Sequence, residues 1–565
     1  MTRQQAVRGV AGAAALIAVL TVLARVAGFG RSVVFTNTVG AASTGDTYLA
    51  ANNVPNIVFE VVAGGALASL VVPMLAGGIA AGDREQVRQT ASALLGWALL
   101  VLTPLAVALA LLARPIAGAL LGDDAADPGK VDLAARFLVV FAPQVVLYGI
   151  GIVLTGVLQA HRRFAGPALA PLLSSVVVAG AYLTFAGIGG GRDVEDLSRP
   201  AELVLGVGTT LGVVALAGCL LLPLQGLRLG LRPRLRFPVG AAPAVRRLAL
   251  AGVITLAGQQ LVAVVAIRLA NAGAVPDGTQ VVYFAGMTLF LLPWAALAVP
   301  LATSAYPGLS ERAAVGDDEG FRRVLAPVVV LVVALSAVAA AGLVAVSGPM
   351  ARVYLASPEN AASAVRLAPT IVAFVPGLLG YGLVAVLTRA LYARGSWRSP
   401  TVCVAGGWLV AVVADLVLSA VLPADDRAVA LALGHTTGVT VAGVGLLVVV
   451  GRTVGAAALT GLPRVAGVAV LAGLLGGAAG LAVSRALGAD PVPTGGVLAA
   501  VGTGMVAGVV VLVVAGAVMM ALARRPLLAA VAGLRGSGDG TPGSGTPGSG
   551  TSAGSAERST AGEAR

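Results

Sequence analysis

The chain has 565 residues, of which 58% are hydrophobic and only 11% are charged, and its mean hydropathy is +0.95. An ordinary soluble domain carries about 25% charged residues, so this composition excludes a water-soluble globular protein. The net charge is +12, but aromatic residues make up only 4% of the chain. Because the arginines occupy short loops between apolar runs, the charge does not indicate a protein that binds nucleic acid.

Apolar runs of about 20 residues, the length that crosses the hydrocarbon core of a bilayer, recur along most of the chain. They predict an all-α polytopic membrane protein with about fourteen transmembrane helices. We expect these helices at about 10–37, 47–80, 90–113, 133–160, 165–188, 201–226, 245–271, 279–306, 324–347, 362–392, 400–422, 427–450, 464–486 and 495–523.

The distribution of charge between the apolar runs predicts the orientation of the chain. With Arg3 and Arg8 in the cytoplasm, the arginine-rich loops all fall inside, as the positive-inside rule requires. The loops that contain Asp123, Asp193 and Asp425 fall outside. The pattern therefore favours a multi-pass protein of a bacterial plasma membrane with both termini cytoplasmic. Lys130 is the only lysine, which suggests a GC-rich coding sequence.

Changes in composition divide the chain into five predicted parts. An Arg- and Pro-rich cytoplasmic linker at 227–244 separates a six-helix bundle, 1–226, from a second bundle, 245–450. Two further helices occupy 451–523. Residues 536–565 are rich in Gly, Ser, Pro and Thr and are expected to form a disordered cytoplasmic tail. The basic linker is interpreted as ordinary attraction to anionic headgroups, or as a specific device for handling an anionic lipid.

The second apolar run contains polar residues that do not suit a lipid-facing helix. Asn52, Asn56 and Glu60 recur at four-residue intervals and therefore share one helix face. Pro55 should kink the same helix. A polar stripe on a kinked helix favours a water-filled substrate cavity, with hydrogen bonding between helices as the alternative.

Charged residues in three other apolar runs are further site candidates. Arg25 and Arg31 flank a glycine-containing segment of the first run, and Arg268 ends the seventh, where it either lines the cavity or reaches the interface. Asp415 lies in the middle of the eleventh run, and Thr436 lies in the twelfth. A carboxylate with nearby hydroxyl and carbonyl oxygens suits a cation or proton site, the alternative being a buried aspartic acid that bonds a neighbouring helix.

Several short segments are similar to the motifs of one family. Residues 24–31 read Ala-Arg-Val-Ala-Gly-Phe-Gly-Arg, residues 45–50 read Gly-Asp-Thr-Tyr-Leu-Ala, and residues 54–56 read Val-Pro-Asn. Gly-Ala-Leu at 65–67 and Val-Pro at 72–73 complete the pattern. Together they resemble the signature of the MviN/MurJ-type lipid II flippases, within the multidrug/oligosaccharidyl-lipid/polysaccharide exporter superfamily.

This resemblance implies two six-helix bundles that form a V around a central cavity, with two C-terminal helices beside them. It implies a flippase, not an enzyme, that moves the undecaprenyl-pyrophosphate-linked peptidoglycan precursor lipid II from the inner to the outer leaflet by alternating access during cell-wall biogenesis. Arg25, Arg31 and Asp46 match the family's charged cavity positions. We expect no cofactor beyond a coupling monovalent cation or the membrane potential, and cell-wall synthesis proteins as further partners.

The chain also departs from the family pattern at three places in the implied cavity. Ser32 replaces an acidic residue, Phe59 and Glu60 replace a pair of arginines, and Gly286 and Met287 replace an Asp-Arg pair. The implied cavity therefore retains two of about five arginines that bind pyrophosphate through charge-assisted hydrogen bonds. This leaves two alternatives open. The first is another transporter of the same superfamily, either an exporter of another lipid-linked polysaccharide or a cation-coupled drug antiporter. The second is a cell-wall scaffold that transports nothing.

Overall fold

The computed structural model describes residues 3–61, 67–122, 128–236, 242–488 and 496–536. Within these ranges the chain forms helices joined by short turns, and none of the ranges contains a strand. The predicted all-α membrane fold is therefore confirmed. The predicted tail, apart from Gly536, lies outside the described residues, as do the acidic residues Asp123, Asp124 and Asp127.

The first half of the chain forms helices at the first six predicted spans, with two differences. The second span is divided into α2 and α3, and a short helix, α5, follows α4. The helices are α1 (Arg3–Thr38), α2 (Ser43–Phe59), α3 (Leu67–Ala80), α4 (Arg84–Leu111), α5 (Ala113–Leu121), α6 (Pro128–Ala160), α7 (Ala165–Gly187) and α8 (Arg199–Gln225).

The second half forms helices at the remaining eight predicted spans. The π-helical segment η3 (Trp294–Ala298) joins α10 to α11, and α18 continues beyond its predicted end. The helices are α9 (Ala242–Ala270), α10 (Thr279–Pro293), α11 (Val299–Ala314), α12 (Asp318–Tyr354), α13 (Ala361–Phe374), α14 (Gly377–Ala393), α15 (Arg398–Val421), α16 (Arg427–Thr453), α17 (Leu462–Ala486) and α18 (Val497–Gly536).

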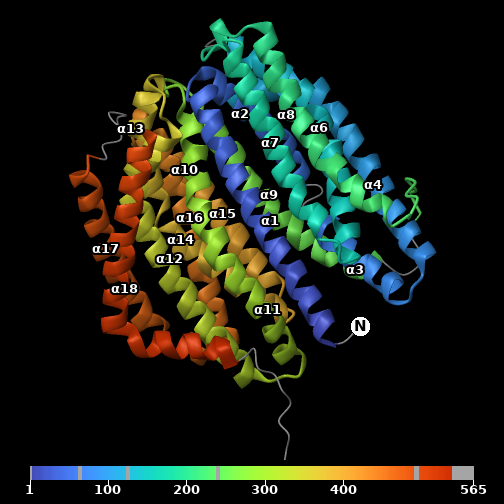
Figure 1. Cartoon of the computed structure of the whole chain (residues 1–565), viewed down its shortest axis with the longest axis vertical. Coiled ribbons are helices and arrows are strands. Elements are labelled where there is room, and N and C mark those ends of the chain that lie inside the picture. The colour runs from blue at the N-terminus through green and yellow to red at the C-terminus, as the bar shows by residue number, and fades with distance from the viewer. Residues whose placement is uncertain (1–2, 62–66, 123–127, 237–241, 489–495, 537–565) are drawn as a thin grey trace, which may run out of the picture.

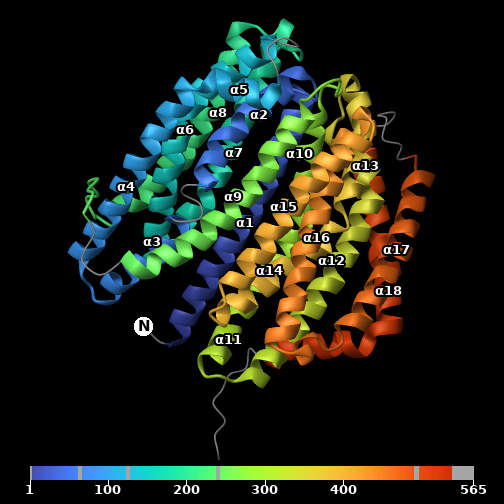
Figure 2. The same ribbon diagram turned by 180° about the vertical axis from the view of Figure 1, so that it is seen from behind.

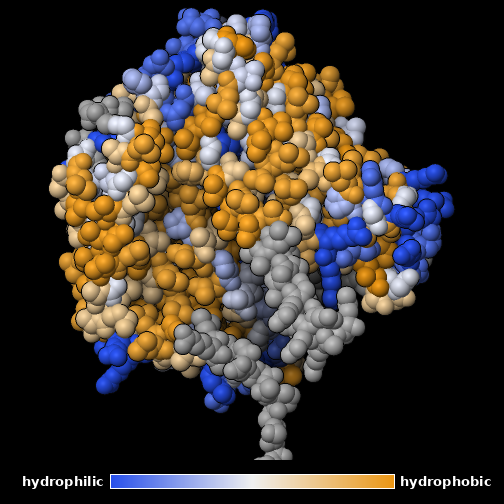
Figure 3. Space-filling model, in the orientation of Figure 1, coloured by the Kyte–Doolittle hydropathy of each residue, from blue (hydrophilic) through white to orange (hydrophobic). Residues whose placement is uncertain are grey.

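The lengths and hydropathy of these helices fit a membrane. Ten helices in the described ranges are long and apolar enough to cross a bilayer, and a helix pair that bends by 45° between Phe374 and Gly377 gives an eleventh. The other predicted spans correspond to α1, to α2 with α3, and to α9. Hydrophobic side chains cover much of the coloured surface in Figure 3, as expected where lipid surrounds the protein.

The helices form two groups on either side of α1. In Figure 1, α2 to α8 lie on one side of the diagonal α1, and α10 to α18 lie on the other. The rear view shows α9 beside α1 and α15 (Figure 2); α9 packs against α15 and also touches α3 and α5. The last two helices, α17 and α18, pack on each other and on α12. Chain segments from both halves therefore enclose the centre of the molecule.

Glycine allows close packing within the second group. A Cβ atom added at Gly407 of α15 would lie 2.7 Å from the carbonyl oxygen of Gly438 in α16 and 2.7 Å from the Cβ of Ala442. A Cβ added at the preceding Gly406 would meet nothing within 4 Å. Small residues at such contacts let two helix backbones approach closely, which is how helices associate where lipid gives no hydrophobic driving force.

These two neighbouring glycines provide a matched test of the packing. Gly407→Ala should lower the thermal unfolding temperature of the purified protein, because overpacking a close contact costs about 1–3 kcal/mol. Gly406→Ala should leave that temperature unchanged or raise it, since alanine is favoured over glycine in a helix interior by about 0.5–1 kcal/mol. Unfolding would be followed in one detergent by intrinsic fluorescence. Equal shifts in both variants would contradict the packing.

Candidate functional site

A cavity lies between α1, α2, α7 and α10, at the centre of the molecule. It has two chambers, one of about 300 Å³ and one of about 580 Å³. Arg31, Ser32 and Thr288 line both chambers, so the two meet at this level. The larger chamber reaches Pro167 and Ala168 in the first turn of α7, and thus extends toward the end of the bundle where α6 and α7 join.

The two predicted arginines of α1 both face this cavity. Arg31 lies at the junction of the chambers, and Arg25 lines the larger chamber and is exposed. The walls of both chambers, as far as the structure describes them, contain no Asp or Glu side chain. Two guanidinium groups without a local acid give the cavity a positive potential, which suits an anionic ligand such as a phosphate group.

The polar stripe of α2 is divided by the structure. Asn52 and Asn56 line the smaller chamber together with Asn53. Glu60 is half-buried at the end of α2, and the described walls of the two chambers do not include it. The asparagines offer both donors and acceptors, which suits the hydroxyl and amide groups of a polar ligand. The sequence therefore predicted the asparagine face but not the different position of Glu60.

Buried hydroxyl groups fix the wall behind these asparagines. The Tyr48 hydroxyl lies 2.8 Å from that of Tyr182 and 2.7 Å from that of Thr209. The Thr209 hydroxyl also donates to the Leu205 carbonyl, 2.7 Å away. Tyr182 and Thr209 line the smaller chamber. These contacts join α2, α7 and α8 into one rigid wall, and no regular spacing in the sequence indicates them.

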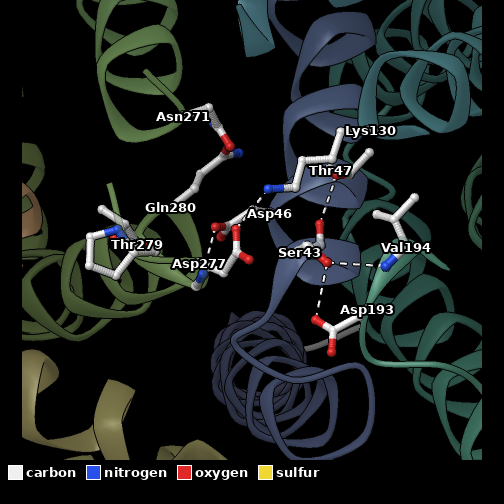
Figure 4. Close-up of polar contacts among 12 residues, drawn as sticks. Ser43, Asp46, Thr47, Lys130, Asp193, Val194, Asn271, Asp277, Thr279 and Gln280 are labelled. Carbon is white, nitrogen blue, oxygen red and sulfur yellow. Dashed lines mark hydrogen bonds and ion pairs between the residues drawn. The ribbon is translucent and has the colours of Figure 1, made fainter. Parts of the chain in front are cut away.

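Asp46 lies at one end of the cavity, in a contact between the two helix groups. Its carboxylate accepts hydrogen bonds from the backbone N–H groups of Gly278, at 2.7 Å, and Val281, at 2.9 Å (Figure 4). The first N–H groups of a helix have no partner within it, and Gly278, the N-cap residue of α10, has no side chain. Asp46 of α2 thus caps α10 from the other half of the chain.

Further polar contacts join the two groups at the same end. The Asn37 side chain donates to the Tyr354 carbonyl at 3.0 Å and accepts from the Ala356 N–H at 2.8 Å. Asn360 donates to the Thr36 carbonyl at 2.9 Å and accepts from the Ala41 N–H at 3.2 Å. These residues and Asp46 define what we call the closed end, which lies at the top of Figure 1.

Ion pairs add to the closed end. Arg192 lies 3.0 Å from the Glu359 carboxylate, and Lys130 of α6 lies 2.8 Å from the carboxylate of Asp277, which precedes α10. Figure 4 shows Lys130 reaching across to Asp277 beside Asp46. These pairings could not be predicted from the sequence, because the partners are more than 140 positions apart. Polar residues at the ends of predicted helices are the only signal that could have indicated them.

Arg268 lies in the last turn of α9, away from the described walls of both chambers. Its Nη1 atom is buried and has no hydrogen-bond partner. A Cβ atom added at Gly122, which ends α5, would lie 3.7 Å from this nitrogen. A positive group beside the carbonyl end of a helix interacts favourably with its dipole, so Arg268 contributes to the contact between α9 and α5.

Asp415 and Thr436 lie in the second helix group but have different surroundings. Asp415 is fully buried, and neither carboxylate oxygen has a hydrogen-bond partner. The Thr436 hydroxyl donates to the carbonyls of Ala373, at 2.9 Å, and Phe374, at 3.2 Å. These carbonyls belong to the last turn of α13, beside the bend to α14, where the last carbonyls of a helix lack partners within it. The Thr436 hydroxyl thus gives a hydrogen bond to carbonyl groups at the point where the helix is interrupted.

The helix that packs against Asp415 is α16, which contains His435. A Cβ atom added at Gly434, the residue before His435, would lie only 2.0 Å from the Asp415 Oδ1 atom. His435 is 3% exposed, and neither ring nitrogen has a hydrogen-bond partner. Its ring packs against the rings of four aromatic residues, with centroids 5.5–6.1 Å away: Phe290, Phe374, Tyr381 and Trp408. The sequence pattern had placed Thr436, rather than this histidine, at the predicted cation or proton site.

The fold and the cavity define a class of protein, a polytopic helical membrane transporter with a central cavity that is closed at one end. Solved structures share this fold. The chain is similar to "Lipid II flippase MurJ, inward closed conformation", with a TM-score of 0.68, 16% identity and coverage of 89% of this chain and 98% of that one. It is also similar to an inward-facing multidrug resistance MATE family transporter of the MOP superfamily, with a TM-score of 0.61, 15% identity, and coverage of 77% and 94%.

Sequence comparison identifies the family. The model of the family "Lipid II flippase MurJ" matches residues 35–487. A "Probable lipid II flippase MurJ" of Vibrio cholerae is 25% identical over 418 residues, which are 72% of this chain and 76% of that one. A "Lipid II flippase MurJ" of Burkholderia cenocepacia is 24% identical over 419 residues, with coverage of 70% and 76%. The chain therefore belongs to the MurJ lipid II flippase family, as the sequence motifs predicted.

The capping contact of Asp46 can be tested by measuring how often the closed end separates. Asp46→Ala removes hydrogen bonds to a charged group that are worth about 1.5–3 kcal/mol each. The substitution should therefore raise the fraction of molecules in which the closed end is separated at least about tenfold. Spin labels at Glu195 and Ala274, both exposed and in different halves, would report this as a second, longer distance, in a background with Cys219 and Cys403 replaced by alanine.

The control is Asp193→Ala, which removes a carboxylate that accepts from Ser43 at 3.2 Å. Both of these residues belong to the first half of the chain, so the distance distribution of this variant should match that of the parent. If Asp46→Ala and the parent gave the same distribution, Asp46 would not hold the closed end together.

Proposed function

We propose that this chain translocates lipid II from the inner to the outer leaflet of the bacterial plasma membrane. Besides membership of the family, one observation supports this proposal: the described walls of the central cavity contain Arg25 and Arg31 and no acidic side chain. Lipid II bears a pyrophosphate, and arginine binds phosphate oxygens through two parallel charge-assisted hydrogen bonds. The polar head of the cargo would occupy the cavity while its polyprenyl chain stays in lipid.

In this proposal the pyrophosphate reaches Arg25 first and Arg31 second. Arg25 is exposed in the larger chamber, which extends toward the α6–α7 end, and Arg31 lies at the junction with the smaller chamber. The asparagine face of α2 then meets the sugar and peptide groups. Because the family's other cavity arginines are absent from this sequence, Arg25 and Arg31 supply most of the attraction for the anion.

Alternating access requires that only one end of the cavity is open at a time. The closed end is held by Asp46, Asn37, Asn360 and the ion pairs of Arg192 and Lys130. The positive-inside rule places the arginine-rich loop at the α6–α7 turn, Arg162 and Arg163, in the cytoplasm. We therefore assign the closed end to the outer face and this conformation to the step that receives cargo from the inner leaflet.

Arg31 provides the direct test of the proposed function. In a bacterium whose own lipid II flippase is depleted, the parent chain should restore lipid II on the outer leaflet. Arg31→Ala should lower this exposure about tenfold or more, because a hydrogen bond to a charged group contributes about 1.5–3 kcal/mol. Exposure would be measured with an impermeant reagent that recognises lipid II, at matched membrane levels of each variant.

Two controls distinguish the loss of binding in the cavity from a general loss of positive charge. Arg199→Ala removes an exposed arginine whose ion-pair partner is Glu202, outside the described cavity walls, and should retain full activity. Arg31→Lys keeps the positive charge but cannot form bidentate hydrogen bonds, so its activity should fall between those of the parent and of Arg31→Ala. Full lipid II exposure with Arg31→Ala would exclude the proposed binding role.

We further propose that Asp415 and His435 form a proton site that couples transport to an ion gradient. Both side chains are buried, and their four polar atoms have no hydrogen-bond partner. Unpaired buried polar groups are costly, so a proton that neutralises the carboxylate stabilises this arrangement. A sodium ion needs several oxygen ligands. Thr436, the hydroxyl predicted for that purpose, is already bonded to Ala373 and Phe374.

The nature of the coupling ion can be measured in proteoliposomes that contain lipid II. An imposed pH gradient should accelerate flipping by the parent chain, and a sodium gradient of equal size should not. Asp415→Asn, which keeps the shape but not the titrating group, should abolish the effect of the pH gradient and leave basal flipping measurable. Thr436→Val serves as a neighbouring control and should keep the pH effect. A sodium response in the parent would exclude a proton site.

A further inference from the structure

The linker after α8 is fixed to the surface of the first helix group. The N–H of Arg232 donates to the Ser92 hydroxyl at 3.2 Å, and the N–H of Arg234 donates to the Ser92 carbonyl at 3.1 Å. The Trp97 indole N–H donates to the Leu235 carbonyl at 2.9 Å. Residues 226–236 are therefore held along α4.

Glycine makes this close approach possible. A Cβ atom added at Gly96 of α4 would lie 2.0 Å from the Arg234 carbonyl oxygen, a distance that no side chain can occupy. The linker also turns through positive φ angles at Arg228, 48°, and Gly230, 57°. Left-handed backbone at a non-glycine residue is uncommon. A connector that only joined two bundles would not require such a specific path.

A groove of about 350 Å³ lies beneath the linker. Its walls are mostly aliphatic and come from three helices and the linker itself: Leu95, Ile150, Leu154, Leu224, Leu229 and Leu231. The polar exceptions are Gln225 and Arg228, which line the same groove. An apolar channel with a cationic group at its border matches the chemistry of a phospholipid, which joins an acyl chain to a phosphate.

The charged side chains of the linker beside the groove are all positive. Residues 226–236 contain four arginines, Arg228, Arg232, Arg234 and Arg236, and no acidic residue. All four are exposed. Hydrophilic side chains gather beside α4 on the right of Figure 3. The acid Glu85 is already paired with Arg88 at 2.6 Å, so these arginines remain available for an anionic headgroup.

The groove also lies at the level expected for a lipid headgroup. Next to it, Trp97 is 40% exposed and Leu222 is 71% exposed, as suits side chains that face the interface and the hydrocarbon. The linker arginines begin within a few residues of Leu222 in the sequence. An acyl chain in the groove would therefore continue into the bilayer, while its phosphate met the arginines.

We propose that the linker and the groove beneath it form a binding site for one anionic phospholipid. Its acyl chain lies among the leucines, and its phosphate binds Arg228 and Arg232. The ligand is a structural lipid of the inner leaflet and not the transported cargo, because the site is on the outer surface of the first helix group. The inference does not depend on the proposed transport function.

Native mass spectrometry of the full chain would test this site. The detergent-solubilised protein would be mixed with equimolar phosphatidylglycerol and phosphatidylcholine that carry the same acyl chains. The parent should retain one phosphatidylglycerol in preference to phosphatidylcholine. Arg228→Ala/Arg232→Ala should reduce this retention by about fivefold for each arginine, and Arg228→Lys/Arg232→Lys should keep most of it.

Two other variants distinguish a built site from general surface charge. Arg524→Ala/Arg525→Ala removes two exposed arginines from α18 and should leave retention unchanged. Leu154→Trp fills the groove and should lower retention while every arginine remains, with a thermal unfolding temperature that verifies folding. Equal retention of the two lipids by the parent, or equal losses in the two double-alanine variants, would overturn the proposal.

Discussion

A helix in a bilayer cannot give its backbone hydrogen bonds to water, and this constraint determines where the chain can interrupt its helices. Three interruptions in the described ranges lie after Phe59, at η3 and between Phe374 and Gly377. Each belongs to a helix that carries part of the functional apparatus. At the third, the Thr436 hydroxyl of α16 donates to the Ala373 and Phe374 carbonyls of the interrupted helix. The irregular backbone between α13 and α14 is thus paired with the neighbouring helix α16, the helix that also carries His435.

The two halves of the chain are joined in a different way from the helices within each half. Within the second half, glycines such as Gly407 bring backbones into direct contact, which cannot separate without creating a void. Between the halves, the closed end relies on hydrogen bonds and ion pairs, including those of Asp46 and Arg192. When the halves separate, water replaces these polar partners, so opening costs only the net contribution of each hydrogen bond. The chemistry of the contacts thus favours motion between rigid halves over deformation of either half.

Much of the fold could be predicted from sequence because the bilayer imposes one length and one polarity on every crossing. The asparagine face of α2 also followed from spacing, since four residues return to the same side of a helix. The capping role of Asp46 did not follow, because Gly278 and Val281 lie more than 230 positions away. The resemblance to the family placed Asp46 in the cavity, because it matches a charged position of the family motif. The partners of Asp46 become visible only in the three-dimensional structure. The same limit applied to His435, whose aromatic surroundings come from four other helices.

The ion pair of Lys130 and Asp277 has a consequence for the chemistry of the whole molecule. Lys130 is the single lysine among 565 residues, so reagents that acylate amines have one side-chain target besides the α-amino group. That target lies where the two halves meet. An ammonium group held in an ion pair at this contact is less accessible to a reagent than one on a free surface. The rate of acylation at this one position is thus a built-in reporter of whether the two halves are together or apart.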